Sequence, residues 1–251
     1  MAVPATSDPL ISPVRFAELV APAVSRAFVA GMRAGGTEGR DLVARYGGVA
    51  VGYLIDLRNP LAAGRGLGPA DLAAVYRYTD PAEVRETVRR SVDHGLLVEA
   101  ADGTVTAAET GRAFLRELTD LHGRVLADRW PATWVDRLNP LLGRVLAAAG
   151  ATGGPAWAVQ APPYLPPGTP PGVQLLNRLS TLRYHRADAH AAAWQAAGLT
   201  AAELAAMPWG SEWSQQRQAV EEDTNRRAAD PYRVLTADQR LGLLADLAAL
   251  P

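Results

Sequence analysis

Residues 80–118 read DPAEVRETVRRSVDHGLLVEAADGTVTAAETGRAFLREL, and this stretch decides the fold. Asp80 is a typical helix cap, Pro81 suits the first helical position, and valines at every fourth position then predict one buried stripe. Gly95 ends this helix. Two short apolar runs follow on either side of Asp102-Gly103, a dipeptide typical of tight hairpin turns. A further helix, beginning near residue 109, completes the pattern.

Residues 69–78 precede this stretch and predict a short helix, which a turn at Thr79-Asp80 joins to the next one. The order helix, turn, helix, hairpin, helix is that of a winged helix. We therefore expect a mainly α fold, in which a winged helix-turn-helix module with a small β-hairpin wing is embedded in a helical domain.

Residues 69–118 resemble the DNA-binding module of MarR-like regulators, including the run DHGLLV…DGTVTAAETGRAFL. The resemblance implies that the helix beginning at residue 81 contacts DNA. Three arginines on that helix are then the candidate DNA-binding residues: Arg85, Arg89 and Arg90. The expected wing tip, Ala-Ala-Asp-Gly-Thr, departs from the pattern because it has no arginine to enter a minor groove.

The charge of this region disfavours DNA. Residues 69–111 contain four arginines and eight acidic residues, a net charge of −4, and the whole chain has a net charge of −1. Affinity for DNA depends on cations placed where the phosphates lie. Arg85 and Arg89 share one exposed face, where they either reach a groove or pair with neighbours such as Glu86 and Asp93.

The sequence predicts three parts: N-terminal helices over 1–68, the winged helix over 69–120, and a C-terminal helical domain over 121–251. The last part includes a Gly- and Pro-rich loop at 150–172, which Trp157 and Tyr164 predict to pack down on the protein. The chain has no cysteine, no lysine, no signal peptide and no apolar run long enough to span a membrane. We expect a cytoplasmic protein, no membrane partner, no cofactor and no metal site.

The helix predicted over 172–197 carries the most unusual polar residues. On a helical wheel, Arg186 falls at the centre of a leucine stripe, with His190 beside it and His185 on one flank. A buried, unpaired guanidinium costs several kcal/mol, so Arg186 requires a carboxylate or a ligand. The candidate protein partners are Asp56, Glu221, Glu222 and Asp223.

Two interpretations of this helix stay open. In one, Arg186 and a carboxylate form a structural ion pair beside a core histidine. In the other, they line a cavity where His185 or His190 acts as an acid or base. The ligand-binding candidates are then Arg186, Asp56, Tyr164, Trp157 and Trp194, with Trp209 and Trp213 as further walls.

The run LRYHRADAHAAAW (182–194) is similar to a helix in a family of actinobacterial helix-turn-helix proteins with an L-R-x-H-R-x-D-x-H pattern. The segment DTNRR (223–227) and Pro231-Tyr232 extend this resemblance through the C-terminal half. The resemblance implies the helix-turn-helix fold more than any activity.

These observations predict a MarR-like, small-molecule-responsive transcriptional regulator that forms a homodimer and binds a small, anionic ligand. DNA is a candidate partner, which the acidic balance disfavours. The alternative is an enzyme of small-molecule metabolism, built on a winged-helix scaffold that does not bind DNA, with His and Arg acid–base chemistry in a helical cavity. A dimerising interaction protein without chemistry is the third hypothesis.

Overall fold

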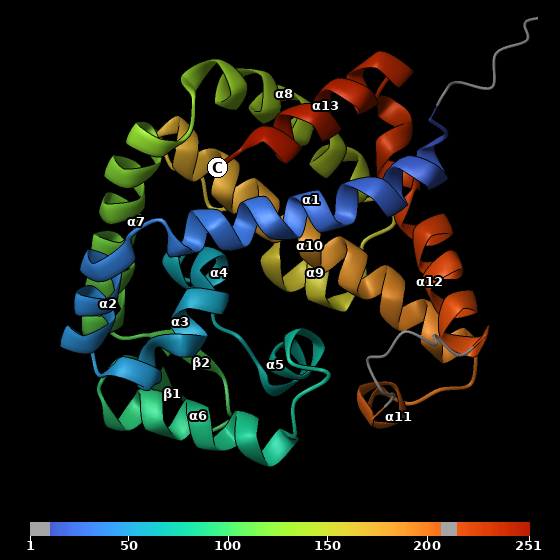
Figure 1. Cartoon of the computed structure of the whole chain (residues 1–251). Coiled ribbons are helices and arrows are strands. Elements are labelled where there is room, and N and C mark those ends of the chain that lie inside the picture. The colour runs from blue at the N-terminus through green and yellow to red at the C-terminus, as the bar shows by residue number, and fades with distance from the viewer. Residues whose placement is uncertain (1–10, 207–214) are drawn as a thin grey trace, which may run out of the picture.

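The computed structural model describes residues 11–206 and 215–251, a mainly helical fold with one two-stranded antiparallel sheet (Figure 1). In chain order its elements are α1 (Pro13–Arg33), α2 (Gly36–Arg45), the 3₁₀ helix η1 (Gly48–Val51), α3 (Gly52–Asp56), α4 (Arg58–Ala62), α5 (Pro69–Val75), α6 (Pro81–Asp93), β1 (Leu97–Glu99), β2 (Val105–Ala107), α7 (Glu109–Arg129), α8 (Ala132–Ala149), α9 (Pro155–Gln160), α10 (Pro171–Ala196), α11 (Ala201–Ala206), α12 (Gln215–Ala228), the 3₁₀ helix η2 (Asp230–Val234) and α13 (Ala237–Ala249).

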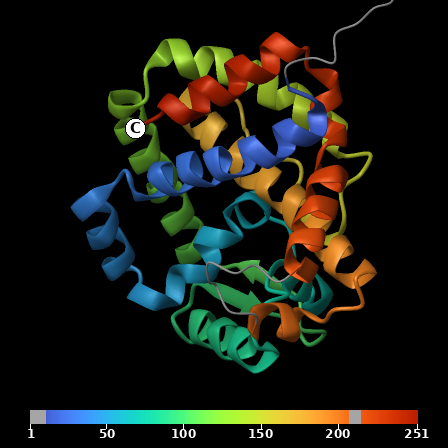
Figure 2. The ribbon, with the colours of Figure 1, turned by 45° about the vertical axis from the view of Figure 1, so that its right-hand side comes forward.

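Two hydrophobic cores lie above and below the middle of the molecule as Figure 1 shows it. The upper core joins α1, α8, α10 and α13, and the lower core joins α2–α6, the hairpin and the first half of α7. The long helix α7 belongs to both, since Phe114 is buried in the lower core and Leu126 in the upper one. Helix α10 runs between them and contacts α1, α7, α8, α9 and α12 (Figures 1 and 2).

This division differs from the predicted boundary at residue 68. Helix α1 buries Phe16, Val20 and Val24 against the C-terminal helices, whereas α2, α3 and α4 pack with the hairpin unit. The reason is the length of the apolar stripe on α1, which spans several turns and needs the long helices α10 and α13 to cover it.

The hairpin region follows the predicted order of elements. The Asp80 side chain accepts a hydrogen bond from the Ala82 amide, and Gly103 takes a left-handed backbone conformation, with φ +80°, in the hairpin turn. β1 and β2 pair with Leu97 opposite Ala107. Leu67, just before α5, adds a bridge to Val105 through two hydrogen bonds of 2.9 Å.

The segment over 150–172, expected to be a loop, contains the short helix α9. Trp157 on this helix is buried in the upper core, as the prediction of a segment that packs down requires. Trp209 and Trp213, predicted as cavity walls, lie outside the residues that the structure describes.

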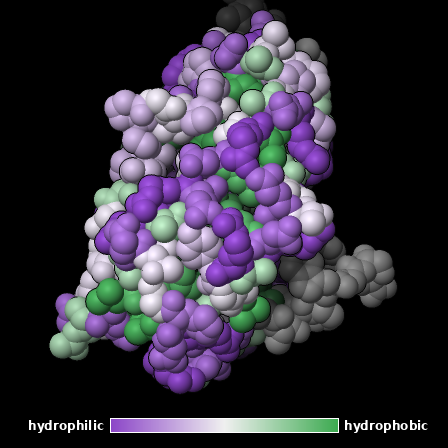
Figure 3. Space-filling model, turned by 90° about the vertical axis from the view of Figure 1, so that its left-hand side faces the viewer, coloured by the Kyte–Doolittle hydropathy of each residue, from purple (hydrophilic) through white to green (hydrophobic). Residues whose placement is uncertain are grey.

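Among the described residues, no helix has both the length and the apolarity to cross a membrane. No group of three or more His, Asp or Glu side chains in the same part of the chain is placed to hold a metal ion. On the side formed by α2 and α7, hydrophilic residues dominate the surface, and hydrophobic residues appear in separate small groups (Figure 3).

Candidate functional site

A hollow of about 520 Å³ lies between α10 and the turn that joins α5 to α6. We call it the α10 hollow. Its lining comes from α1, α3, the α5–α6 turn at 76–80, α10, α12 and η2, so residues far apart in the sequence meet there. Its polar lining residues are Ser25, Asp56, Tyr76, Tyr78, Arg183, Tyr184, Arg186, His190, Glu221 and Tyr232.

The structure brings three of the predicted site residues into this hollow: Asp56, Arg186 and His190. The Arg186 guanidinium donates to Asn225 Oδ1 at 2.8 Å and to Glu221 Oε2 at 3.2 Å. Its side chain is 29% exposed, so it lies at the wall of the hollow and not in the closed core. Glu221, one of the four candidate carboxylates, is the acid that pairs with Arg186.

Glu221 also contacts His190, which starts a chain of polar groups. His190 Nε2 lies 3.5 Å from Glu221 Oε1, and Nδ1 lies 2.9 Å from the Tyr78 hydroxyl. A carboxylate only accepts, so we place the imidazole proton on Nε2, and Nδ1 then accepts the hydrogen bond from Tyr78. Trp194 Nε1 donates to the Tyr78 oxygen at 3.1 Å. The hydrogen bond to His190 is the main cause that holds the pKa of Glu221 below its usual range.

Asp56 lies across the hollow from this chain, at the end of α3. Its carboxylate is open to the hollow and accepts a hydrogen bond from Tyr76 at 3.4 Å, while the surrounding protein raises its pKa. Burial also raises the pKa of Tyr184 to about 12. The hollow therefore holds several phenols that stay protonated at neutral pH, and they supply both donors and apolar wall.

Arg183 is the second cation of the hollow, and it stacks on the Phe28 ring at 4.3 Å. Burial lowers its pKa. Phe28 also contacts Arg58, whose guanidinium is 5.3 Å from the ring centre and is enclosed in the protein interior. Burial lowers the pKa of Arg58 to about 10.

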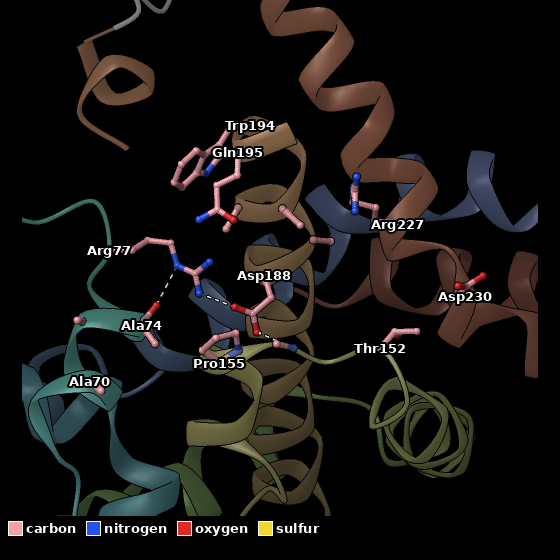
Figure 4. Close-up of a pocket in the computed structure, with 15 residues that line it drawn as sticks. Ala70, Ala74, Arg77, Thr152, Pro155, Asp188, Trp194, Gln195, Arg227 and Asp230 are labelled. Carbon is pink, nitrogen blue, oxygen red and sulfur yellow. Dashed lines mark hydrogen bonds and ion pairs between the residues drawn. The ribbon is translucent and has the colours of Figure 1, made fainter. Parts of the chain in front are cut away.

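A second, larger hollow of about 840 Å³ lies on the opposite side of α10 (Figure 4). In it, Arg77 reaches from the α5–α6 turn to Asp188 on α10, at 2.5 Å. Asp188 also accepts from the amides of Gly154, Ala156 and Trp157 at the start of α9. Every charge at this pair is therefore compensated within the protein, which makes it a structural joint.

Four other predicted site residues do not line the α10 hollow. His185 is buried, its Nε2 lies 2.9 Å from Thr152 Oγ1, and burial lowers its pKa, so it is a neutral core histidine and not the expected acid–base group. Trp157 packs edge-on against it. Trp194 lines the opposite hollow, and Tyr164 lies at two smaller cavities near α7. A wheel for one helix gives directions only, and cannot say which neighbour closes each direction.

The three arginines predicted to contact DNA lie on α6. Arg89 pairs with Glu86 at 2.7 Å and approaches Asp93 at 3.6 Å, and Arg90 is 3.6 Å from Glu86. Arg85 is exposed and forms no ion pair with any residue that the structure describes. The charges on two of the three arginines are thus already met by neighbouring acids on the same helix.

The sequence reasoning missed Arg183, Tyr78 and Asp188. Asp188 and Arg77 are 111 residues apart, so no local pattern pairs them. Arg183 carried one usable signal, because it precedes Arg186 by three residues and therefore lies near it on α10.

Comparison with known proteins adds no assignment, since no protein-family model, curated protein or solved structure matches this chain.

Proposed function

We propose that this protein is a small-molecule-responsive regulator of the winged helix-turn-helix class, and that the α10 hollow is its ligand site. One observation carries the proposal: the hollow is walled on one side by α10 and on the other by the turn between α5 and α6. A ligand there contacts both the helical part and the helix-turn-helix part of the chain.

The order of elements supports the winged-helix assignment. Helices α5 and α6 are followed by the β1–β2 hairpin, and the bridge between Leu67 and Val105 adds a third short strand beside it. The exposed face of α6 and the hairpin then correspond to the recognition helix and the wing of such a module.

The contacts of the turn support the coupling. Residues 77 and 78 each bind α10, Arg77 through Asp188 and Tyr78 through His190 and Trp194. A ligand that displaces Tyr78 from His190 changes how the turn is held, and the turn sets the direction of α6. Regulation by a ligand needs such an element with two arrangements that the ligand distinguishes.

The ligand half of the proposal is tested by filling the hollow. Ala187 lines it, and Ala187→Trp should abolish the thermal stabilisation that a panel of small metabolites gives to the wild type. Ala196→Trp, at an exposed position near the end of the same helix, is the matched control and should leave it unchanged. If no compound stabilises the wild type more than Ala187→Trp, the hollow is not a ligand site.

The DNA half is tested separately by selecting fragments of genomic DNA on the protein at about 50 mM salt, where phosphate contacts are strongest. We expect weak binding that Arg85→Ala reduces further, because Arg85 is the α6 arginine without an acidic partner among the described residues. No selected fragment at low salt contradicts the regulator and leaves a ligand-binding protein.

An acid–base enzyme is the second candidate, and the chain from Glu221 through His190 to Tyr78 favours it. In this reaction a proton leaves the substrate for the Tyr78 oxygen, while the Tyr78 proton passes to Nδ1 of His190. The resulting imidazolium faces Glu221, which stabilises its charge. Turnover of a library of small carbonyl compounds, followed by mass spectrometry and lost in Tyr78→Phe, would support the enzyme; no turnover by the wild type contradicts it.

A further inference from the structure

We infer that Arg183 is the anchor of a carboxylate-binding subsite in the α10 hollow, and that the natural ligand is a small organic monoanion. This inference rests on the proposed ligand site and names the chemistry of its occupant. It assigns the anion to Arg183 and not to Arg186, the arginine that the sequence pattern singles out.

The surroundings of Arg183 lack a negative partner. The guanidinium is half-buried on the Phe28 ring, and within the ranges 11–206 and 215–251 no hydrogen bond or ion pair reaches it. Asp56 lines the same hollow and acts on the pKa of Arg183 through its charge, but the two groups do not form an ion pair. A partly desolvated guanidinium has five donors to satisfy, and stacking on a ring satisfies none of them.

The other guanidiniums on α10 are already occupied. Arg186 donates to Glu221 and Asn225, and Arg178 donates to Asn139 Oδ1 at 2.6 Å. Arg183 thus differs from its neighbours on the same helix in having its planar fork free. Such a fork binds the two oxygens of a carboxylate side by side.

The local charge favours a single negative charge on the ligand. Arg58 and Arg183 both contact Phe28, and Arg58 has only uncharged partners, Asn177 Oδ1 and the Ile55 carbonyl, with Nη2 unpaired. Asp56 is the one carboxylate whose charge acts on both, which leaves a surplus of one positive charge. The ion pair of Arg186 with Glu221 adds no net charge. A carboxylate balances this surplus, whereas a phosphate dianion exceeds it and is repelled by Asp56.

The walls of the hollow indicate an apolar body on the ligand. Val75 and Leu182 lie beside the rings of Tyr76 and Tyr184, and the volume of about 520 Å³ is in the range of small-molecule sites. The ligand is therefore a carboxylic acid whose hydrocarbon part packs against these side chains.

The test compares three six-carbon probes that differ only in their head group: hexanoate, hexanamide and hexyl phosphate. Affinities are measured by calorimetry on the full chain at low and high salt. We expect hexanoate to bind more tightly than both others, and high salt to weaken it. Arg183→Gln should weaken hexanoate about 10- to 100-fold, since a hydrogen-bonded charge is lost. Arg178→Gln, a half-buried arginine on the same helix outside the hollow, should leave the affinity unchanged.

Several results overturn the inference. Equal affinity for hexanamide, equal affinity of Arg183→Gln, tighter binding of hexyl phosphate, or no binding of any probe would each do so. Arg183→Lys retains the charge without the planar fork and should bind with intermediate affinity, which keeps the test valid if Arg183→Gln folds poorly. The proposed ligand site fails separately, because it is judged by the metabolite panel and the Ala187→Trp variant, neither of which involves Arg183.

Discussion

Replacement of Asp188 by Asn should destabilise the protein strongly, because this carboxylate joins three parts of the chain. Its side chain is 6% exposed and that of Arg77 is 14% exposed, so their ion pair is shielded from water. The same carboxylate accepts from the amides of Gly154, Ala156 and Trp157, at 3.1, 3.2 and 2.7 Å. Asn keeps the shape and one accepting oxygen, but its amino group faces donors.

The cost follows from these contacts. Breaking a buried ion pair by changing one partner costs about 3–5 kcal/mol, because the other charge is left uncompensated. In Asp188→Asn the remaining side-chain oxygen still accepts from the α9 amides, so we expect the lower end, about 3 kcal/mol. In a protein of this size that corresponds to a fall in Tm of roughly 6–12 °C.

Urea unfolding and calorimetry measure this change, and a double-mutant cycle isolates its cause. Adding Arg77→Met to Asp188→Asn should recover part of the lost stability, since it removes the unpaired cation. A fall in the free energy of unfolding below about 0.5 kcal/mol in Asp188→Asn would refute the reasoning, because a loss that small is typical of solvent-exposed pairs.

Three further predictions concern stability. Burial lowers the pKa of His122 from 6.5 to about 4, so between these pH values the unfolded chain binds a proton that the folded chain does not. The free energy of unfolding should therefore fall by up to about 3 kcal/mol as the pH drops from 6.5 to 4, and urea titrations of His122→Gln should show a smaller fall. Gly111→Ala should lower Tm severely, because its Cβ would meet the Leu96 carbonyl oxygen at 2.1 Å, whereas Gly143→Ala, with no atom within 4 Å in mid-helix, should raise stability by about 0.5–1 kcal/mol in the same calorimetric assay. Tyr78→Phe should cost about 1 kcal/mol in urea unfolding, because the buried Trp194 N–H loses its acceptor.

Local patterns predicted the local elements of the hairpin region. The cap at Asp80, the stop at Gly95 and the turn at Gly103 each depend on neighbours within a few residues, and the structure places them as expected. The assignment of α1 to the upper core was not predictable in this way. An apolar stripe states that a face is covered, but which helix covers it is decided by the lengths and positions of all the others.

The site was predictable to the same extent. The wheel of α10 correctly raised the question of what compensates Arg186, and Glu221 was among the candidates. It could not distinguish Arg183 from Arg186, because the difference between them comes from Glu221 and Asn225 on α12. His185 and His190 illustrate the same limit: they are five residues apart on one helix, and only their neighbours make one a core residue and the other part of the hollow.

The α5–α6 turn gives the coupling proposal a quantitative consequence. Arg77 and Tyr78 are adjacent in sequence, yet they bind α10 on opposite sides, toward Asp188 and toward His190. Coupling between two sites is reciprocal, so a ligand that requires the turn in its present position also stabilises the Arg77–Asp188 pair. Asp188→Asn should therefore weaken ligand binding in the α10 hollow, although Asp188 does not line it, and saturating ligand should reduce the stability lost in this variant. If Asp188→Asn binds ligand as tightly as the wild type, the turn does not transmit occupancy of the hollow, and the helix-turn-helix part responds to something else.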